Sequence, residues 1–215
     1  MSVVRLDPSP ATVEVVTTLL CEAFAEYPVM RFVLGPGEDY PARLRRLIGL
    51  FVTNRAVPGH PFFGISIGPE LAGVALCTPP NPPPASTALQ EIRERAWAAL
   101  GHDARERYDA CVRAWTEVGI AEPNLHLNML GVRPRSQGQG LASPLMERVH
   151  ALSRELPPSR GVTLTTEDPR NVPLYRRFGY EVVGRRPVAP GLETWGFFRR
   201  DEGGASGGGG ASLEG

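Results

Sequence analysis

Two glycines at the predicted start of a helix are the feature of this sequence most suited to chemistry. Residues 125–132 predict a strand, after which the chain turns through Pro134 and reaches Gly138 and Gly140. Glycine lets the backbone approach a bulky anion closely, and a helix N-terminus supplies unpaired N–H groups and a positive dipole potential. The segment therefore predicts an anion site that is well suited to a pyrophosphate.

Two other phosphate-binding motifs fit this segment poorly. Every basic residue is an arginine, so the chain has neither a P-loop lysine nor a lysine that could form a Schiff base. The dinucleotide fingerprint needs a third glycine where this chain has Ser143. It also needs an acidic residue at a strand end about 20 positions on, whereas Glu155 falls at the end of a predicted helix. A Rossmann nucleotide-binding module is therefore a distant alternative.

The segment instead resembles the acyl-CoA motif of the GNAT superfamily of N-acetyltransferases. In that motif a Gln or Arg is followed three positions later by Gly and five positions later by Gly or Ala. Here the three positions are Arg135, Gly138 and Gly140. A second family element lies downstream, where residues 164–180 resemble the strand, the Asn-containing loop and the LYxxxGF helix of the family. The resemblance extends over residues 3–200 and so includes most of the chain.

Within the superfamily the chain looks most like the puromycin N-acetyltransferase branch, on residues 23–28, 170–175 and 193–195. This likeness does not identify puromycin as the substrate. The superfamily resemblance implies an α/β fold with a mixed central sheet that is splayed around a CoA cleft and has helices on both faces. It also implies acetyl-CoA as cosubstrate and a homodimer.

The resemblance implies a role for each part of the cleft. The pantetheine arm of CoA would pair with backbone at Leu130 and Val132, and N–H groups of residues 137–141 would hold the pyrophosphate. Asn171 would hydrogen-bond the pantetheine or acetyl end, and the Tyr175 hydroxyl would point at the CoA sulfur. The implied acetyl-CoA contacts are Leu130, Gly131, Val132, Arg135, Gln137, Gly138, Gln139, Gly140, Leu141, Asn171 and Tyr175.

Acetyl transfer to an amine needs a neutral nitrogen. An alkylamine of pKa about 10.4 loses its proton at pH 7 at a cost of roughly 4–5 kcal/mol, so a general base or a water chain is useful. The base candidates are Glu26, where the first predicted helix ends, and His126, on the strand beside the cleft. His126 and Asn128 share one strand face unless a β-bulge intervenes. On reference pKa values, full proton transfer from Tyr175 to a thiolate is uphill by about 2 kcal/mol, so hydrogen bonding is its expected role.

Each of these residues also has a purely structural interpretation. The glycines can form an ordinary turn before a helix, Tyr175 can be a packing aromatic, and Asn171 can cap the short helix that follows it. His126 can be a satisfied strand histidine, and Glu26 a solvated loop acid. The sequence alone leaves these alternatives open.

The elements that must position these residues alternate between strands and helices. Strands are predicted at residues 3–6, 62–67, 71–77, 125–132, 161–165, 180–183 and 194–198. Ser9 is predicted as the N-cap of a helix that runs from Pro10 to a break at Tyr27 and Pro28. Further helices are predicted at residues 43–54, 87–118 with a break near Gly101, 139–154 and 171–178. Pro144 falls inside the helix predicted at 139–154, where a proline removes a backbone bond. The alternation predicts a mixed α/β sheet covered by helices.

Composition narrows the class of protein. The 23 basic and 23 acidic residues balance, so the chain lacks the basic footprint of a general nucleic-acid binder. The three cysteines have no CxxC spacing, and neither a metal site nor a disulfide framework is expected. No segment resembles a signal peptide or a membrane span, which predicts a cytoplasmic protein with no membrane partner. Residues 1–202 are predicted to form one domain, and the Gly/Ser-rich residues 203–215 a flexible tail.

Together these observations predict an enzyme that moves acetyl from acetyl-CoA to a primary amine of a small molecule. The alternatives are acetylation of a protein N-terminus or lysine, and a non-catalytic acyl-CoA-binding regulator. A peptide acceptor needs a groove open at both ends, whereas residues 78–115 are bulky enough to close one side of a pocket. A regulator would have no need for the hydroxyl of Tyr175.

Overall fold

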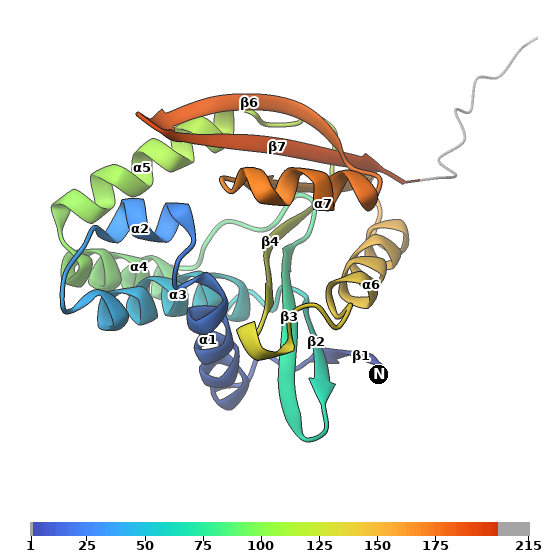
Figure 1. Cartoon of the computed structure of the whole chain (residues 1–215), viewed down its shortest axis with the longest axis horizontal. Helices are drawn as coiled ribbons and strands as arrows, with labels where there is room; N and C mark the ends of the chain where they lie inside the picture. Colours follow the sequence, from blue (N-terminus) through green and yellow to red (C-terminus); the bar gives the residue numbers. More distant parts are fainter. Residues whose placement is uncertain (1, 202–215) are drawn as a thin grey trace, which may run out of the picture.

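Seven β-strands form one mixed sheet in the computed structural model, which describes residues 2–201 (Figure 1). The strands lie in the order β1-β2-β3-β4-β5-β7-β6, and every neighbouring pair is antiparallel except β4 with β5. Their bounds are β1 (Val3–Leu6), β2 (Phe62–Ile67), β3 (Glu70–Thr78), β4 (Leu125–Val132), β5 (Gly161–Thr166), β6 (Glu181–Ala189) and β7 (Leu192–Arg200).

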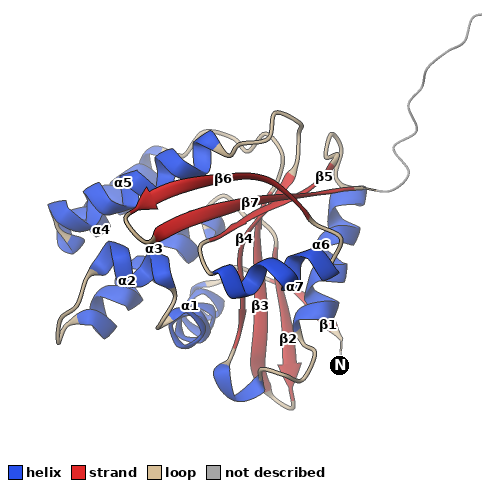
Figure 2. Ribbon diagram, turned by 45° about the horizontal axis from the view of Figure 1, so that its top comes forward, coloured by secondary structure: helices blue, strands red, loops and turns tan. Residues whose placement is uncertain are grey.

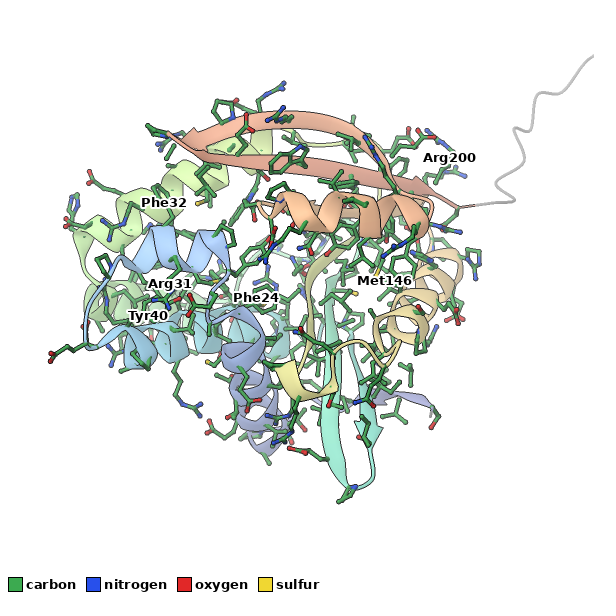
Figure 3. All side chains as sticks on the ribbon, viewed as in Figure 1. Phe24, Arg31, Phe32, Tyr40, Met146 and Arg200 are labelled. Atoms are coloured by element: carbon green, nitrogen blue, oxygen red, sulfur yellow. The ribbon has the colours of Figure 1, made fainter. Side chains whose placement is uncertain are left out.

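Helices cover both faces of this sheet (Figure 2). Two hydrophobic clusters lie beneath them, one on the side of α1 to α5 and the other on the side of α6 and α7. Phe24, at the end of α1, and Met146, in α6, mark these two sides in Figure 3. The predicted α/β fold with helices on both faces is therefore confirmed. The helices are α1 (Pro10–Phe24), α2 (Pro28–Leu34), α3 (Tyr40–Ala56), α4 (Thr87–Leu100), α5 (His102–Glu117), α6 (Ala142–Glu155) and α7 (Val172–Arg177).

The strands β4 and β5 diverge soon after they begin. Their parallel pairing is limited to Leu125 with Val162 and His126 with Thr163, so residues 127–132 of β4 have ladder partners only in β3. Each strand is held on its other edge by an antiparallel neighbour, β3 or β7, and parallel pairing is slightly weaker per residue. The sheet therefore opens between β4 and β5, as expected of a splayed central sheet.

A β-bulge at Asn128 interrupts the regular alternation of side chains along β4. The ladder with β3 skips Asn128 between Leu127 and Met129. Leu127 packs in the core beneath α6 and Met129 in the core beneath α1, although residues two apart in a regular strand share a face. The alternation that would have put His126 and Asn128 on one face therefore ends at this bulge.

Local sequence signals define the first two helices. Ser9 caps α1 by accepting a hydrogen bond from the Thr12 N–H at 3.3 Å, and Pro10 takes the first helical position, as predicted. The helix ends at Phe24, before the predicted break. Pro28 does not simply stop a helix but begins α2, which was not predicted. Its fixed φ and missing N–H suit the first position of a new helix.

The helix α6 begins at Ala142 rather than at residue 139, which corrects the predicted boundary. With Leu141 as N-cap, Pro144 is the third helical residue, inside the first turn where backbone N–H groups have no intrahelical partner. The proline therefore removes no helical hydrogen bond. Residues 137–141 instead form a loop of their own between β4 and the helix.

The two C-terminal strands are longer than predicted, and they form a hairpin that packs against α5 (Figure 1). The predicted Gly/Ser-rich tail at residues 203–215 lies outside the described residues. Between residues 2 and 201, no helix combines the length and the apolar character needed to cross a membrane.

Candidate active site

A cavity of about 1020 Å³ occupies the opening between β4 and β5. Its walls come from both strands, from the ends of α1 and α2, from one side each of α3 and α5, and from α7 and β7. Along β4 the cavity extends from His126 to Val132 and on to Gln137 in the following loop. His126 and Val132 are about 20 Å apart along the strand at 3.3 Å per residue.

The loop between β4 and α6 presents free backbone N–H groups. Gly138 and Gly140 have φ angles of +77° and +76°, which L side chains rarely adopt. A Cβ at either glycine would meet no atom within 4 Å, so the backbone conformation requires glycine while the loop surface stays open. Among the residues described, the N–H groups of 138–142 find no acceptor, whereas the Gln137 N–H donates to the Pro134 carbonyl at 3.3 Å. This is the geometry of an anion site at a helix N-terminus.

Two arginines tie this loop to the rest of the fold. Arg133 is buried, its Nε donates to the Leu71 carbonyl at 2.9 Å, and its guanidinium pairs with Glu22 of α1. Arg135, the first residue of the predicted motif, is exposed and pairs with Glu70 at the β2–β3 turn. Because Arg135 is engaged there, the free N–H groups of the loop are the main donors left for an anion.

The strand edge predicted to meet the pantetheine arm is unpaired. Leu130, Gly131 and Val132 all line the cavity, on the part of β4 that has no partner toward β5. Such an edge offers N–H and C=O groups to an extended ligand. A Cβ on Gly131 would lie 2.6 Å from Leu20 Cδ2, so glycine is required there for α1 to pack against the backbone of β4.

Tyr175 reaches the cavity from α7 with a free hydroxyl. Its ring is buried and packs against Phe197 and Tyr180, at centroid distances of 5.5 and 6.0 Å. The hydroxyl forms no hydrogen bond with any residue from 2 to 201. Burial, followed by the charge of Glu167, raises the pKa of this phenol well above its ordinary value. The phenol therefore stays protonated at neutral pH, and its hydrogen is available to a ligand.

Asn171 also lines the cavity, just before α7. Its Nδ2 donates to the Thr166 hydroxyl oxygen at 3.1 Å, and its side chain makes no capping bond to α7. The interpretation of Asn171 as a simple helix cap therefore does not describe its contacts. Its amide oxygen has no donor within the described chain, so it can accept a hydrogen bond from a ligand.

His126 is neutral and has one ring nitrogen free. Its Nδ1 lies 2.9 Å from Thr163 Oγ1, and the Thr163 hydroxyl donates to Asn124 Oδ1 at 2.6 Å. That second bond uses the only hydroxyl hydrogen, so Nδ1 of His126 must carry the proton and Nε2 must be the acceptor. Burial, followed by the charge of Arg55, lowers the pKa of this imidazole to about 4. Nε2 accepts no hydrogen bond from the described residues, and the side chain lines the cavity.

Glu26, the other predicted base, lies at the rim. Its side chain is 78% exposed and pairs with Arg31 of α2. The Arg31 guanidinium lies 3.9 Å from the ring centroid of Tyr40, and Figure 3 labels these two neighbours. The carboxylate of Glu26 is therefore solvated and already engaged by a cation.

Glu167, which was not singled out from the sequence, is a buried carboxylate in the cavity wall. It accepts hydrogen bonds from the Trp115 indole at 2.8 Å, from the Thr194 hydroxyl at 2.7 Å and from the Tyr27 hydroxyl at 3.0 Å. Burial raises the pKa of this carboxyl, although these hydrogen bonds lower it in part. One signal was present, because Glu167 directly follows β5 and ligands of open α/β sheets bind at the carboxyl ends of strands.

The charges that line the cavity are unequally compensated. Asp168 pairs with Arg170 at 2.6 Å. By contrast, Glu167 and Arg55 both line the cavity, and neither takes part in an ion pair with a residue of the described chain. The cavity therefore has one uncompensated negative group and one uncompensated positive group.

One cluster of metal-ligating types occurs among the described residues, formed by His102, Asp103 and Glu106. It is exposed on the first turns of α5 and does not line the cavity. The cavity combines an open strand edge, a protonated phenol, an uncharged imidazole and a buried carboxylate, and a loop of free N–H groups follows directly after its lining residue Gln137. This set can bring an extended anionic ligand together with a second molecule and transfer a group between them.

Comparison with known proteins agrees with this geometry. Residues 103–195 match the family described as the acetyltransferase (GNAT) domain. The chain is 20% identical to a Corynebacterium glutamicum protein described as histone acetyltransferase HPA2 and related acetyltransferase, with a TM-score of 0.68 over 95% of this chain and 100% of that one. A Drosophila melanogaster polyamine N-acetyltransferase that forms N-acetylagmatine is 19% identical, with a TM-score of 0.59 over 91% and 97%.

A third similar structure acts on a different kind of acceptor. The Escherichia coli ribosomal-protein-S18-alanine N-acetyltransferase is 12% identical, with a TM-score of 0.56 over 96% of this chain and 97% of that one. At these identities the likeness concerns the fold, and the acceptors in the names differ from a small amine to a protein.

Proposed function

Because residues 103–195 match the GNAT acetyltransferase domain, we propose that this chain is a GNAT acetyltransferase that transfers the acetyl group of acetyl-CoA to a primary amine of a small molecule. The observation that carries the proposal is that one cavity extends along β4 to Gln137, directly before the free N–H groups of residues 138–142. The pyrophosphate of acetyl-CoA would lie on that loop, and the pantetheine arm along the open edge of β4 at Leu130 and Val132. The thioester would then lie beside Tyr175.

The reaction needs no covalent enzyme intermediate. The lone pair of the neutral amine attacks the thioester carbonyl, a C–N bond forms, and the C–S bond breaks as CoA leaves as a thiolate. The proton that the attacking nitrogen then carries passes to the thiolate, directly or through solvent, which gives the amide and the CoA thiol. Tyr175 stabilises that thiolate by donating a hydrogen bond. Its raised pKa makes complete proton transfer more uphill than the reference value of about 2 kcal/mol, which favours hydrogen bonding over proton donation.

Glu167 is our proposed site for the incoming ammonium. A carboxylate has about four acceptor positions, and protein donors fill three of them, so one remains for the amine. The raised pKa makes Glu167 a stronger base than an ordinary carboxylate, while the pKa of about 4 makes His126 a weak one. His126 Nε2 is therefore assigned to orient the amine by accepting a hydrogen bond. We rank both groups ahead of the exposed Glu26.

A small acceptor is favoured by the walls of the cavity. The predicted bulky segment contains α4 and α5, and α5 supplies Tyr108, Val112 and Trp115 to the cavity lining. Helices on that side narrow the space available for a polypeptide. Acetylation of a protein N-terminus or lysine is the second candidate, and a homodimer and a cytoplasmic location stay predictions.

Thiol release from acetyl-CoA tests the proposal directly. A panel of small amines and short peptides would be compared with wild type and Tyr175→Phe protein. Amine-dependent release that falls in the variant is the expected result. Tight acetyl-CoA binding without release for any amine would favour the non-catalytic regulator. Absence of acetyl-CoA binding in calorimetry would refute the assignment of the cavity.

A further inference from the structure

Arg55 of α3 stands between two pockets without an acidic partner. It lines the active-site cavity and also a second pocket of about 600 Å³, and Phe51 and Tyr108 line both as well. Its Nη1 donates to the Phe51 carbonyl at 3.1 Å, and its other N–H groups have no acceptor among residues 2–201. Although burial lowers the pKa of this guanidinium, arginine remains charged at neutral pH. A half-buried cation with free donors therefore faces the space where the pockets meet.

The second pocket contains basic groups and no acidic lining residue within the described chain. Arg93 reaches it from α4 and donates from Nε to Asn54 Oδ1 at 2.8 Å, without an ion pair to any described residue. His60 contributes a ring whose two nitrogens lack hydrogen-bond partners there. Burial, followed by the charge of Arg55, lowers the pKa of His60, so its ring is neutral and offers one N–H donor. These groups are donors for an anion.

The location of Arg55 separates this site from the pyrophosphate loop. The charge of Arg55 contributes to the lowered pKa of His126, which lies at the start of β4. The pyrophosphate loop follows the other end of that strand, about 20 Å away. A phosphate of acetyl-CoA on the loop therefore does not account for the uncompensated charge of Arg55. Leaving a partly buried cation unpaired is unfavourable, so a ligand on the acceptor side is expected to supply the counter-charge.

We propose that the acceptor of this enzyme is an amine that also carries an anionic group, a carboxylate or a phosphate, which Arg55 binds where the two pockets meet. The inference rests on the proposed function and names its substrate class. Glu167 receives the ammonium and Arg55 receives the anion, so opposite charges in the cavity match opposite charges on one molecule. A polyamine would instead bring a second cation toward Arg55 and Arg93, which is electrostatically unfavourable.

Matched acceptor pairs test this proposal, because each pair differs in the anionic group. The pairs are arginine and agmatine, ornithine and putrescine, and phosphoethanolamine and ethanolamine. We expect at least one anionic member to exceed its partner by about 10- to 100-fold in kcat/KM, the effect of one or two charge-assisted hydrogen bonds. The third pair distinguishes a phosphate from a carboxylate. Equal or lower kcat/KM for the anionic member of every pair would overturn the inference while leaving the proposed function intact.

Variants at the same helix sharpen the test. Arg55→Gln is expected to remove the preference for the anionic member, chiefly through KM, and Arg55→Lys to retain part of it. Arg46→Gln is the matched control, since Arg46 is exposed on α3 and only approaches the Ala99 carbonyl at 3.5 Å. A preference that survives in Arg55→Gln would also refute the proposal. If no amine releases thiol, the proposed function fails. Calorimetry of the same pairs against CoA-loaded wild type then decides the inference, because only the anionic members should bind.

Discussion

Replacing Tyr175 by Phe is expected to separate catalysis from stability. The hydroxyl has no hydrogen-bond partner within the part of the chain that the structure describes, so its removal leaves no buried group unsatisfied. We expect the free energy of unfolding to change by less than about 0.5 kcal/mol. If the hydroxyl stabilises the departing thiolate, kcat should fall by about 100- to 10,000-fold, which corresponds to roughly 3–5 kcal/mol of transition-state stabilisation.

The neighbouring Tyr180 is a matched control with the opposite expectation. Its ring lies 6.0 Å from that of Tyr175, but its hydroxyl is hydrogen-bonded to His150 Nε2 at 3.0 Å. Both residues are buried, so Tyr180→Phe leaves the imidazole without its partner and should cost about 1–3 kcal/mol of stability. For a chain of this size each kcal/mol lowers Tm by about 2–4 °C. Its kcat should stay within a few-fold of wild type, since Tyr180 does not line the cavity.

The assay is thiol release at saturating acetyl-CoA and amine, together with urea and thermal unfolding of both variants. The KM for acetyl-CoA should not change in Tyr175→Phe, because a group that acts only in the transition state alters kcat alone. A kcat within three-fold of wild type would refute the catalytic role. A loss of stability comparable to that of Tyr180→Phe would instead make Tyr175 a packing aromatic.

Three further expectations concern other parts of the site. Glu167→Gln should lower kcat/KM for the amine at least ten-fold and remove the acid limb of its pH profile. The control Glu193→Gln, at a half-buried carboxylate that pairs with Arg185, should do neither, and equal profiles for the two variants would exclude Glu167 as the amine site. The pKa of His126 is about 4 in the folded chain, against an ordinary 6.5. Between pH 4 and pH 6.5 the unfolded chain therefore binds a proton at His126 that the folded chain does not bind. His126 alone should therefore lower stability by up to about 3 kcal/mol as the pH drops through this window. His126→Gln should reduce the slope in urea unfolding, and His150, whose pKa is also lowered to about 4 by burial, should keep part of it. Gly138→Ala should weaken acetyl-CoA binding in calorimetry by about 5- to 30-fold, because an alanine at a φ of +77° costs about 1–2 kcal/mol. The control is Gly68→Ala, in the β2–β3 hairpin at a φ of +59°, which should lower stability without changing the Kd for acetyl-CoA.

The sequence predicted the parts of the fold whose causes are local. The Ser9 cap, the strand at residues 125–132 and the break at Gly101 all have the predicted positions, since each depends on neighbouring residues. The start of α6 was wrong by three residues, because Pro144 is tolerated at the third helical position and a proline alone does not tell which position it takes. The helix α2 was missed because Tyr27-Pro28 is as compatible with a helix start as with a helix end.

The charged groups of the site depend on contacts between distant segments. Glu167 is buried because Tyr27, Trp115 and Thr194 converge on it, and Tyr27 precedes it by 140 residues. Arg55 looks in sequence like any arginine on the polar side of a helix. What distinguishes it is the lack of an ion pair with any described residue and the lack of an acid among the described residues that line the second pocket. The proposed CoA side could be predicted from sequence motifs because it uses backbone groups and local spacing. The proposed acceptor side is formed by tertiary packing, so the sequence pattern carried little information about it.

The charge of Glu167 links the two ends of the proposed reaction. While the carboxylate is ionised, it attracts the ammonium, and its charge contributes to the raised pKa of Tyr175. Once it accepts the proton of the amine, that charge is lost and its contribution to the Tyr175 pKa disappears. The phenol then becomes a stronger hydrogen-bond donor as the thiolate begins to form, because a donor of lower pKa stabilises an anion better. Deprotonation of the acceptor would in this way prepare departure of the leaving group, with no movement of the chain required.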